Sequence, residues 1–380
     1  MIPEVKSYFS SIDWILLLIV FTIPTIGISV LYSASYDPDT EHKFFLWTLN
    51  SGLVLRQLTY CFAGIFVMFV TAAFPAKAAF RLSYYLYVFV LLLLVAVLVY
   101  GTISNGSRRW LSLGPVNLQP SELMKIGVIL ALARYLSKTP PKHGVYGLTE
   151  LFVPCCIFGI PMLVIMRQPD LGTALAVGAI GAAMVLFVGV RKWVLIGTSA
   201  IGVAGVAAAW NWFLHSYQKR RVLTLFDPES DPHGSGYQII QSKIAVGSGE
   251  LFGKGYLEGS QTRLEFIPER TTDFIFCVLA EEWGFIGSVL VISLYFLLFF
   301  RILQGVMRVK DYFSALVGVG VVALLFFHTF VNLGMVVGFL PVVGLPLPLF
   351  SYGGSSMLTT FFALGLVLAV TAQRSVFSSR

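Results

Sequence analysis

The stretch from Phe274 to Leu303 decides the fold, and it reads FIFCVLAEEWGFIGSVLVISLYFLLFFRIL. A helix needs about 20 mostly apolar residues to cross the hydrocarbon core of a bilayer, and this run exceeds that length. Directly before it lies a long polar segment, dense in glycine and charge, that ends at Asp273. The sequence therefore predicts a membrane protein with polar chemistry at a lipid interface.

The composition of the whole chain agrees with this class. The 380 residues are 57% hydrophobic and 12% charged, with a mean hydropathy of +0.82, which soluble domains do not normally show. We expect an all-α polytopic membrane protein that forms a single domain over residues 1–380. The apolar run from Ile12 to Tyr32 exceeds the roughly 7–15 residues of a signal-peptide core, so we expect it to be the first spanning helix.

Ten apolar runs are candidates for spanning helices, and an even number places both termini on one side of the membrane. The predicted spans are Ile12–Ser33, Gln57–Phe74, Leu82–Ile103, Leu118–Leu136, Leu151–Met166, Leu171–Val190, Val194–Leu214, Phe274–Leu303, Phe313–Val337 and Ser351–Val370.

The distribution of lysine and arginine sets the predicted orientation, because short basic loops stay in the cytoplasm. With both termini cytoplasmic, the inner segments hold Lys6, Lys77, Arg81, Arg134, Lys138, Lys142, Arg191, Lys192, Arg301, Arg308, Lys310, Arg374 and Arg380. The short outer loops hold only Lys43, Arg56, Arg108, Arg109 and Arg167. Residues 215–272 then form a large extracytoplasmic loop between spans seven and eight. The net charge of +7 follows from this topology and does not indicate nucleic-acid binding.

Three further polar or Gly/Pro-rich segments fall on the same predicted face as this loop: Ser104–Pro120, Arg167–Ala174 and Gly338–Gly354. Irregular backbone persists at membrane depth only where it is buried in protein or lines a wet cavity. We therefore expect a shared cavity that opens outward.

Metal and nucleotide motifs are missing from the sequence. Cys61, Cys155, Cys156 and Cys277 lie in or beside apolar runs without metal-ligand spacing, and the five histidines form no HExxH pattern. The glycine-rich runs of the insert lack the P-loop pattern, and its alternating acids miss the full EF-hand pattern.

Asp273 ends the polar loop and begins an apolar helix. On position alone it is either an N-cap, whose side chain satisfies the first N–H groups of the helix, or a catalytic carboxylate. Glu281 lies about 12 Å further along the helix axis, whereas a retaining pair of carboxylates needs a separation of about 5 Å. If the reaction is glycosyl transfer, a single base and an inverting displacement fit better.

Glu122 and Lys125 stand three residues apart on the predicted fourth span, so they can pair on one face of a helix. Such a pair is either a structural clasp or part of a cavity wall. The insert and its neighbours also carry many cations, which either form a solvated face for anionic headgroups or bind a phosphate-bearing substrate.

Several motifs resemble those of the SEDS family (shape, elongation, division and sporulation), in matching order over nearly the whole chain. They are Arg109–Gly114 (RWLSLG), Gln119–Glu122 (QPSE), Gln168–Ala174 (QPDLGTA), the motifs of the insert, and Pro348–Ser356 (PLFSYGGSS). The compact amino terminus and Leu264–Arg270 (LEFIPER) favour the elongation branch over the division branch. Relatives often have histidine directly before Thr-Asp-Phe, where this chain has Thr271.

The resemblance implies a peptidoglycan glycosyltransferase that polymerises lipid II into glycan strands. It assigns the essential aspartate to Asp273 and the intramembrane ion pair to Glu122 and Lys125. The remaining substrate or cavity positions that we expect are Arg109, Gln119, Ser121, Lys243, Arg270 and Ser355. Of these, Arg109, Lys243 and Arg270 are the candidates for the lipid diphosphate. A divalent cation, Mg or Mn, is a further candidate to bind the diphosphate, although the chain shows no defined set of metal ligands.

The resemblance also implies partners: lipid II, the nascent glycan strand, a class B penicillin-binding transpeptidase and membrane proteins of the elongation complex. It implies the bacterial cytoplasmic (inner) membrane as the location. For the partner's helix we expect a docking seam at Gly318 and Gly320, with packing inside the protein itself as the alternative. The competing functions are a lipid-linked precursor flippase or other transporter, a division-specific polymerase, and a non-catalytic scaffold.

Overall fold

A computed structural model describes residues 13–36, 52–104, 107–113, 116–141, 144–213, 216–232, 234–264 and 266–372. Each of the ten predicted spans coincides with a helix, and the all-helical polytopic class is confirmed. These helices are α2 (Trp14–Ala34), α3 (Gly52–Ala73), α4 (Ala76–Tyr100), α5 (Pro120–Lys138), α6 (Phe152–Arg167), α7 (Leu171–Val188), α8 (Lys192–Ala208), α12 (Ile275–Val306), α13 (Tyr312–Val336) and α14 (Gly354–Ala372).

Within the described residues, seven of these helices are long and apolar enough to cross a membrane: α2, α3, α4, α7, α12, α13 and α14. The helices of the other three predicted spans do not meet these requirements of length and apolar composition. Helices α6 and α8 are only 16 and 17 residues long. Helix α5 carries Glu122, Lys125 and Arg134 among its apolar residues.

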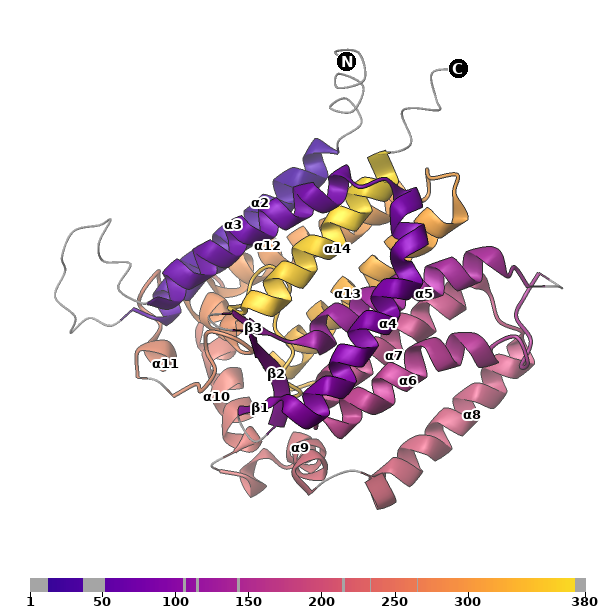
Figure 1. The fold of residues 1–380 in the computed structure, drawn as a ribbon. Helices are drawn as coiled ribbons and strands as arrows, with labels where there is room; N and C mark the ends of the chain where they lie inside the picture. Colours follow the sequence, from indigo (N-terminus) through magenta and orange to yellow (C-terminus); the bar gives the residue numbers. More distant parts are fainter. Residues whose placement is uncertain are drawn as a thin grey trace, which may run out of the picture.

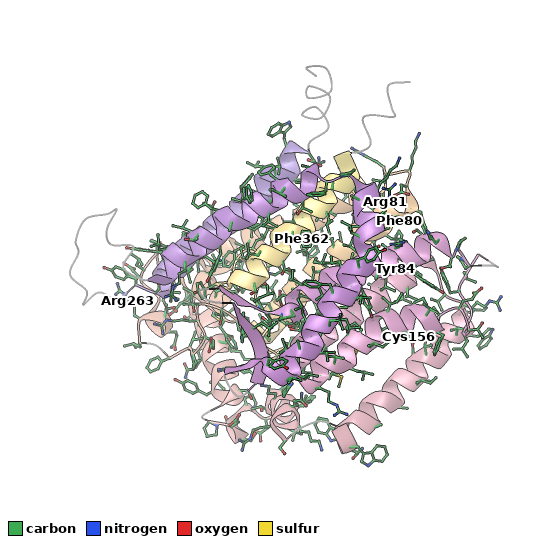
Figure 2. The ribbon with its side chains drawn as sticks, viewed as in Figure 1. Phe80, Arg81, Tyr84, Cys156, Arg263 and Phe362 are labelled. Atoms are coloured by element: carbon green, nitrogen blue, oxygen red, sulfur yellow. The ribbon has the colours of Figure 1, made fainter. Side chains whose placement is uncertain are left out.

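The two ends of the helix bundle carry different elements. The start of α2 and the end of α14 lie at one end, and the strands and α9–α11 lie at the other (Figure 1). Figure 2 shows Phe80, Arg81 and Tyr84 near the start of α4, far from Arg263 on α11. There the Arg134 guanidinium lies 4.9 Å from the ring centroid of Phe80 and 4.3 Å from that of Tyr84. Cations thus pack on aromatic rings at the end where α2 begins.

The predicted outer loop is largely helical. It contains α9 (Ser216–Phe226), a 3₁₀ turn at Pro228–Ser230, α10 (Ser235–Ser248) and α11 (Ser260–Arg263). A short π-helix at Ala209–Phe213 precedes it. The segment between α4 and α5 forms an antiparallel sheet of β1 (Thr102–Ser104), β2 (Ser107–Leu113) and β3 (Val116–Leu118), in that order. The sequence analysis did not predict these strands.

A break in α12 ties the predicted outer segment, which carries α9–α11, to the bundle. Gly284 has φ +64°, and the helix is kinked there. Backbone hydrogen bonds join the two sides, from Phe285 N to Glu250 O at 2.9 Å and from Lys254 N to Glu281 O at 3.0 Å. A β-carbon on Gly253 would lie 2.0 Å from Glu282 O, so only glycine permits this approach. The outer segment is therefore fixed on the helix that follows Asp273.

The expected docking seam on α13 is wrong. Gly318 and Gly320 are buried, and their missing side chains make room for the protein's own core. A β-carbon on Gly318 would lie 2.1 Å from Cγ2 of Val306, and one on Gly320 would lie 2.7 Å from Cγ2 of Ile129. Small residues allow close helix packing whether the neighbour is a partner or the same chain, so their spacing does not separate the two cases.

Candidate active site

Asp273 lies in the turn before α12, within the electrostatic influence of Arg109 on β2 and Arg221 on α9. Phe274 occupies the N-cap position of α12, and that helix has no side-chain cap hydrogen bond, so Asp273 is not its cap. Asn332 of α13 donates to the backbone carbonyl of Asp273 at 2.8 Å. Among the described residues, no hydrogen bond or ion pair involves the Asp273 carboxylate, which leaves it available to a substrate.

The surroundings make this carboxylate a stronger base than an ordinary aspartate. The pKa of Asp273 is raised from 3.8 to about 6: burial raises it most and the negative charge of Glu269 adds to the rise, whereas Arg221 and Arg109 partly offset it. The side chain keeps a small exposed surface, which gives access without full hydration. Glu269 was not singled out from the sequence.

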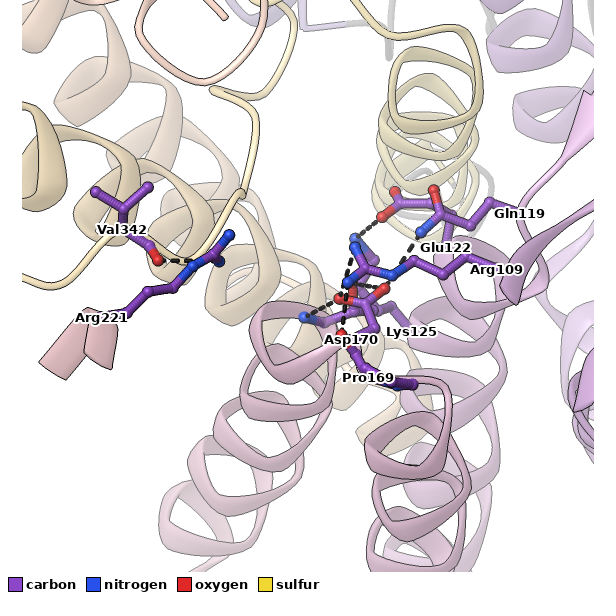
Figure 3. A network of polar contacts seen from close by, with 9 residues as sticks. Arg109, Gln119, Glu122, Lys125, Pro169, Asp170, Arg221 and Val342 are labelled. Atoms are coloured by element: carbon purple, nitrogen blue, oxygen red, sulfur yellow. Dashed lines mark hydrogen bonds and ion pairs between the residues drawn. The ribbon is translucent and has the colours of Figure 1, made fainter. Parts of the chain in front are cut away.

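Arg109 joins three of the sequence motifs at one point. From β2, its Nη2 donates to the carbonyl of Pro169 at 2.5 Å, and its Nη1 lies 3.8 Å from Oδ1 of Asp170 (Figure 3). Asp170 is buried and caps α7, accepting from Thr173 N at 3.2 Å. Gln119 donates to Oδ2 of Asp170 at 3.3 Å. Segments that are 60 residues apart in sequence thus meet at Arg109, whose charge also acts on Asp273.

Glu122 and Lys125 contact each other in the interior of the bundle. Lys125 Nζ lies 2.8 Å from Oε1 of Glu122 and 3.0 Å from Nε2 of His328, and all three side chains are buried. Figure 3 shows this pair beside the Arg109–Asp170 contact. The hydroxyl of Ser121 is also buried and has no hydrogen-bond partner among the described residues. His328 was not expected from the sequence.

Arg221 is a functional candidate that the sequence analysis did not single out. It lies on α9 and donates from Nη1 to the carbonyl of Val342 at 3.1 Å (Figure 3). Its charge also acts on Asp273. The available signal was the basic run Lys219–Arg221 at the start of the insert, but nothing in that run distinguishes the cation that turns toward Asp273.

The other expected positions are more dispersed. Lys243 is exposed on α10, with its side chain against Gly338. Arg270 donates from Nε to the carbonyl of Ala34 at 2.8 Å, at the end of α2. Neither cation is among the charged groups that shift the pKa of Asp273. Ser355 is partly buried in the first turn of α14, and the carbonyl of Thr271 accepts from Tyr352 N at 3.0 Å.

A divalent cation finds no ready set of protein ligands. The described residues hold no group of three or more His, Cys, Asp or Glu side chains placed to bind a metal ion. The two neighbouring acids, Asp273 and Glu269, supply fewer ligands than an all-protein cage would need.

Comparison with known proteins identifies the family. Residues 13–376 match the family described as Cell cycle protein, which comprises FtsW, RodA and SpoVE. The chain is 40% identical over 381 residues to the peptidoglycan glycosyltransferase MrdB of Escherichia coli strain K12, covering 99% of this chain and 98% of the relative. It is 35% identical over 368 residues to stage V sporulation protein E of Bacillus subtilis strain 168, covering 95% and 97%.

Solved structures of related proteins also match this chain. A chain from work on the structural coordination of polymerization and crosslinking by a peptidoglycan synthase complex matches with a TM-score of 0.80 at 37% identity, covering 95% of this chain and 98% of that one. The rod shape-determining protein RodA of Thermus thermophilus matches with a TM-score of 0.70 at 33% identity, covering 95% and 97%. The chain belongs to the SEDS family of FtsW, RodA and SpoVE proteins.

Proposed function

We propose that this peptidoglycan glycosyltransferase polymerises lipid II into glycan strands during cell elongation, by inverting transfer with Asp273 as the general base. The observation that carries the proposal is the Asp273 carboxylate itself. It is partly exposed, makes no hydrogen bond within the described residues, and lies within the influence of Arg109 and Arg221. The relative MrdB is a peptidoglycan glycosyltransferase, which supports the reaction class.

The chemistry needs a base because the 4-hydroxyl of the acceptor sugar is a weak nucleophile. As its oxygen forms the new bond to the anomeric carbon of the donor, its proton passes to Asp273. The bond from that carbon to the lipid diphosphate breaks on the opposite face, which inverts the configuration. With a pKa of about 6, Asp273 is ionised near neutral pH and still basic enough to take the proton.

The leaving diphosphate needs cations rather than a strong acid. Arg109 and Arg221 are the two cations that act on Asp273, so they are the first candidates to hold the departing oxygens. Lys243 and Arg270 are second candidates, for the approach of the anionic substrate to the outer face. In this scheme Asp273 acts on the acceptor hydroxyl, where the new bond forms, and the arginines act on the diphosphate, where the old bond breaks.

The proposal also includes a partner enzyme and a location in the cell. A related structure concerns coordination of polymerization and crosslinking, which supports a crosslinking transpeptidase of class B as the partner here. Tethering raises the effective concentration of the nascent strand at the crosslinking enzyme. The chain lies in the cytoplasmic membrane with both termini in the cytoplasm, and α9–α11 face outward.

Purified protein and lipid II test the reaction directly. We expect glycan polymer from the unaltered protein and none from Asp273→Asn, while both proteins fold and insert into the membrane. Near-normal polymer from Asp273→Asn would remove the general-base role. In sealed liposomes, lipid II movement without polymer formation would instead favour the transporter.

A further inference from the structure

One loop lies beside Asp273: residues 341–350, between α13 and α14. Side chains from three different helices hold its carbonyl groups. Arg221 holds Val342 O at 3.1 Å, Asn332 holds Leu345 O at 2.8 Å, and Tyr295 holds Pro348 O at 2.6 Å. Since a β-carbon on Gly344 would lie 3.4 Å from Oδ2 of Asp273, the place of this loop sets the space beside the carboxylate.

Asn332 binds the loop and Asp273 at the same time. Its Nδ2 donates one proton to Leu345 O and the other to Asp273 O, each at 2.8 Å. The residue is completely buried, so water does not replace either hydrogen bond. A single amide group therefore fixes the distance between the backbone of Asp273 and the backbone beside Gly344.

His328 lies one helical turn before Asn332, on the same face of α13. Its Nε2 lies 3.0 Å from Lys125 Nζ, and its ring also interacts with the backbone of Pro346. An ammonium group only donates, so Nε2 accepts and Nδ1 carries the proton that is available to the Pro346 carbonyl. Lys125, bound to Glu122 at 2.8 Å, thus selects the tautomer that anchors the loop.

We propose that His328 and Asn332 are positioning residues that connect the buried Glu122–Lys125 pair to Asp273 through the loop of residues 341–350. The ion pair then supports catalysis without touching the substrate: it orients His328, His328 holds Pro346, and Asn332 holds the adjoining Leu345 together with Asp273. This inference rests on the proposed role of Asp273 as the base.

Thr329 provides a matched control. It is buried on the same helix, next to His328, and its hydroxyl has no hydrogen-bond partner among the described residues. Thr329→Val keeps its shape and removes nothing from the network. We expect Thr329→Val to retain the kcat, the KM for lipid II and the amide exchange of the unaltered protein.

Asn332→Ala should act on the reaction step. Misplacing a catalytic group by about 1 Å costs about 100-fold in rate, so we expect kcat to fall by that order while KM changes by less than about 2-fold. Hydrogen exchange of the amides in residues 342–350 should rise, which reports loop anchoring independently of the reaction. A kcat like that of Thr329→Val, or unchanged exchange, would overturn the proposal.

Two further variants separate the contacts of His328 and serve if Asn332→Ala does not fold. His328→Asn places an amide N–H near Nδ1 and keeps the bond to Pro346, whereas His328→Gln places its amide near Nε2 and keeps the contact with Lys125. We expect His328→Asn to retain more kcat and slower loop exchange than His328→Gln. The reverse order, or equal values, would reject loop anchoring. If Asp273→Asn polymerises normally, the base assignment fails, but the exchange data still decide the anchoring.

Discussion

The carboxylate of Asp273 faces the backbone of Gly344, and a β-carbon at Gly344 would lie 3.4 Å from Oδ2. Gly344 has φ +73°, in the left-handed region that residues with a side chain adopt at a cost. The glycine thus has two consequences: it permits the turn of the loop, and it leaves open the space beside the carboxylate, where the proposed mechanism places the acceptor hydroxyl.

Gly344→Ala should therefore impair polymerisation. We expect a strain of about 1–2 kcal/mol from the backbone and a further loss of activity because the methyl group narrows the space at Oδ2. Gly353→Ala is the control, since its nearest atom would be Cβ of Ser356 at 3.8 Å and its φ is not positive. Equal activity of the two variants in the lipid II assay would argue against this spatial role.

The rate should depend on pH through Asp273. A general base works only when ionised, so with a pKa of about 6 we expect kcat/KM to fall as the pH drops below about 6. The neighbouring charge of Glu269 raises this pKa, so Glu269→Gln should lower it and move the acidic limb to lower pH. If the acidic limb of the pH profile of kcat/KM does not move in Glu269→Gln, a group other than Asp273 controls that limb.

Asp273→Asn should stabilise the protein while removing activity. The folded pKa exceeds the ordinary value of 3.8, so the charged carboxylate costs stability above about pH 6, and the cost vanishes as both states become protonated at low pH. After discounting for partial exposure, we expect a gain of about 1–2 kcal/mol at pH 7.5. Thermal unfolding should show the difference shrinking as the pH falls through 6, and a difference independent of pH would contradict this account.

The sequence was sufficient for features that depend on local spacing. The spans follow from hydropathy, because a chain in lipid must satisfy its backbone within each helix. The contact between Glu122 and Lys125 follows from their separation of three residues on α5. Asp273 stood out because a carboxylate directly precedes a long apolar helix.

Other features depend on contacts between distant segments. His328 meets Lys125 across 203 residues, and Arg221 meets Val342 across 121. No local pattern states which helix faces are neighbours, so the loop anchors and the second arginine beside Asp273 went unpredicted. Strands β1 and β3 have only three residues each, too few for a periodic signal. The glycines of α13 had the spacing of a docking seam, yet they pack against the protein's own helices.

Glu281 offers a test of how the outer segment is held. Its carboxylate is fully buried and accepts from Lys254 Nζ at 2.7 Å, from the backbone N–H of Gln261 at 3.0 Å and from the Ser260 hydroxyl at 3.1 Å. Lys254→Met strands part of this charge, and we expect a loss of about 1–3 kcal/mol, since the lysine is partly exposed. Adding Glu281→Gln should cost less than the sum of the single changes. Strict additivity in thermal unfolding would argue against a direct pair.

The topology is testable with an impermeant thiol reagent after the four native cysteines are replaced. Ser230 is exposed in the outer segment, and Met307, 75% exposed, lies between α12 and α13 on the predicted inner side. Because the basic short segments belong in the cytoplasm, we expect Ser230→Cys to react in intact cells and Met307→Cys only after lysis. Both sites are accessible, so any difference between them reports the membrane barrier and not local burial. Labelling of Met307→Cys in intact cells, with Ser230→Cys protected until lysis, would invert the whole arrangement and place Asp273 on the cytoplasmic side.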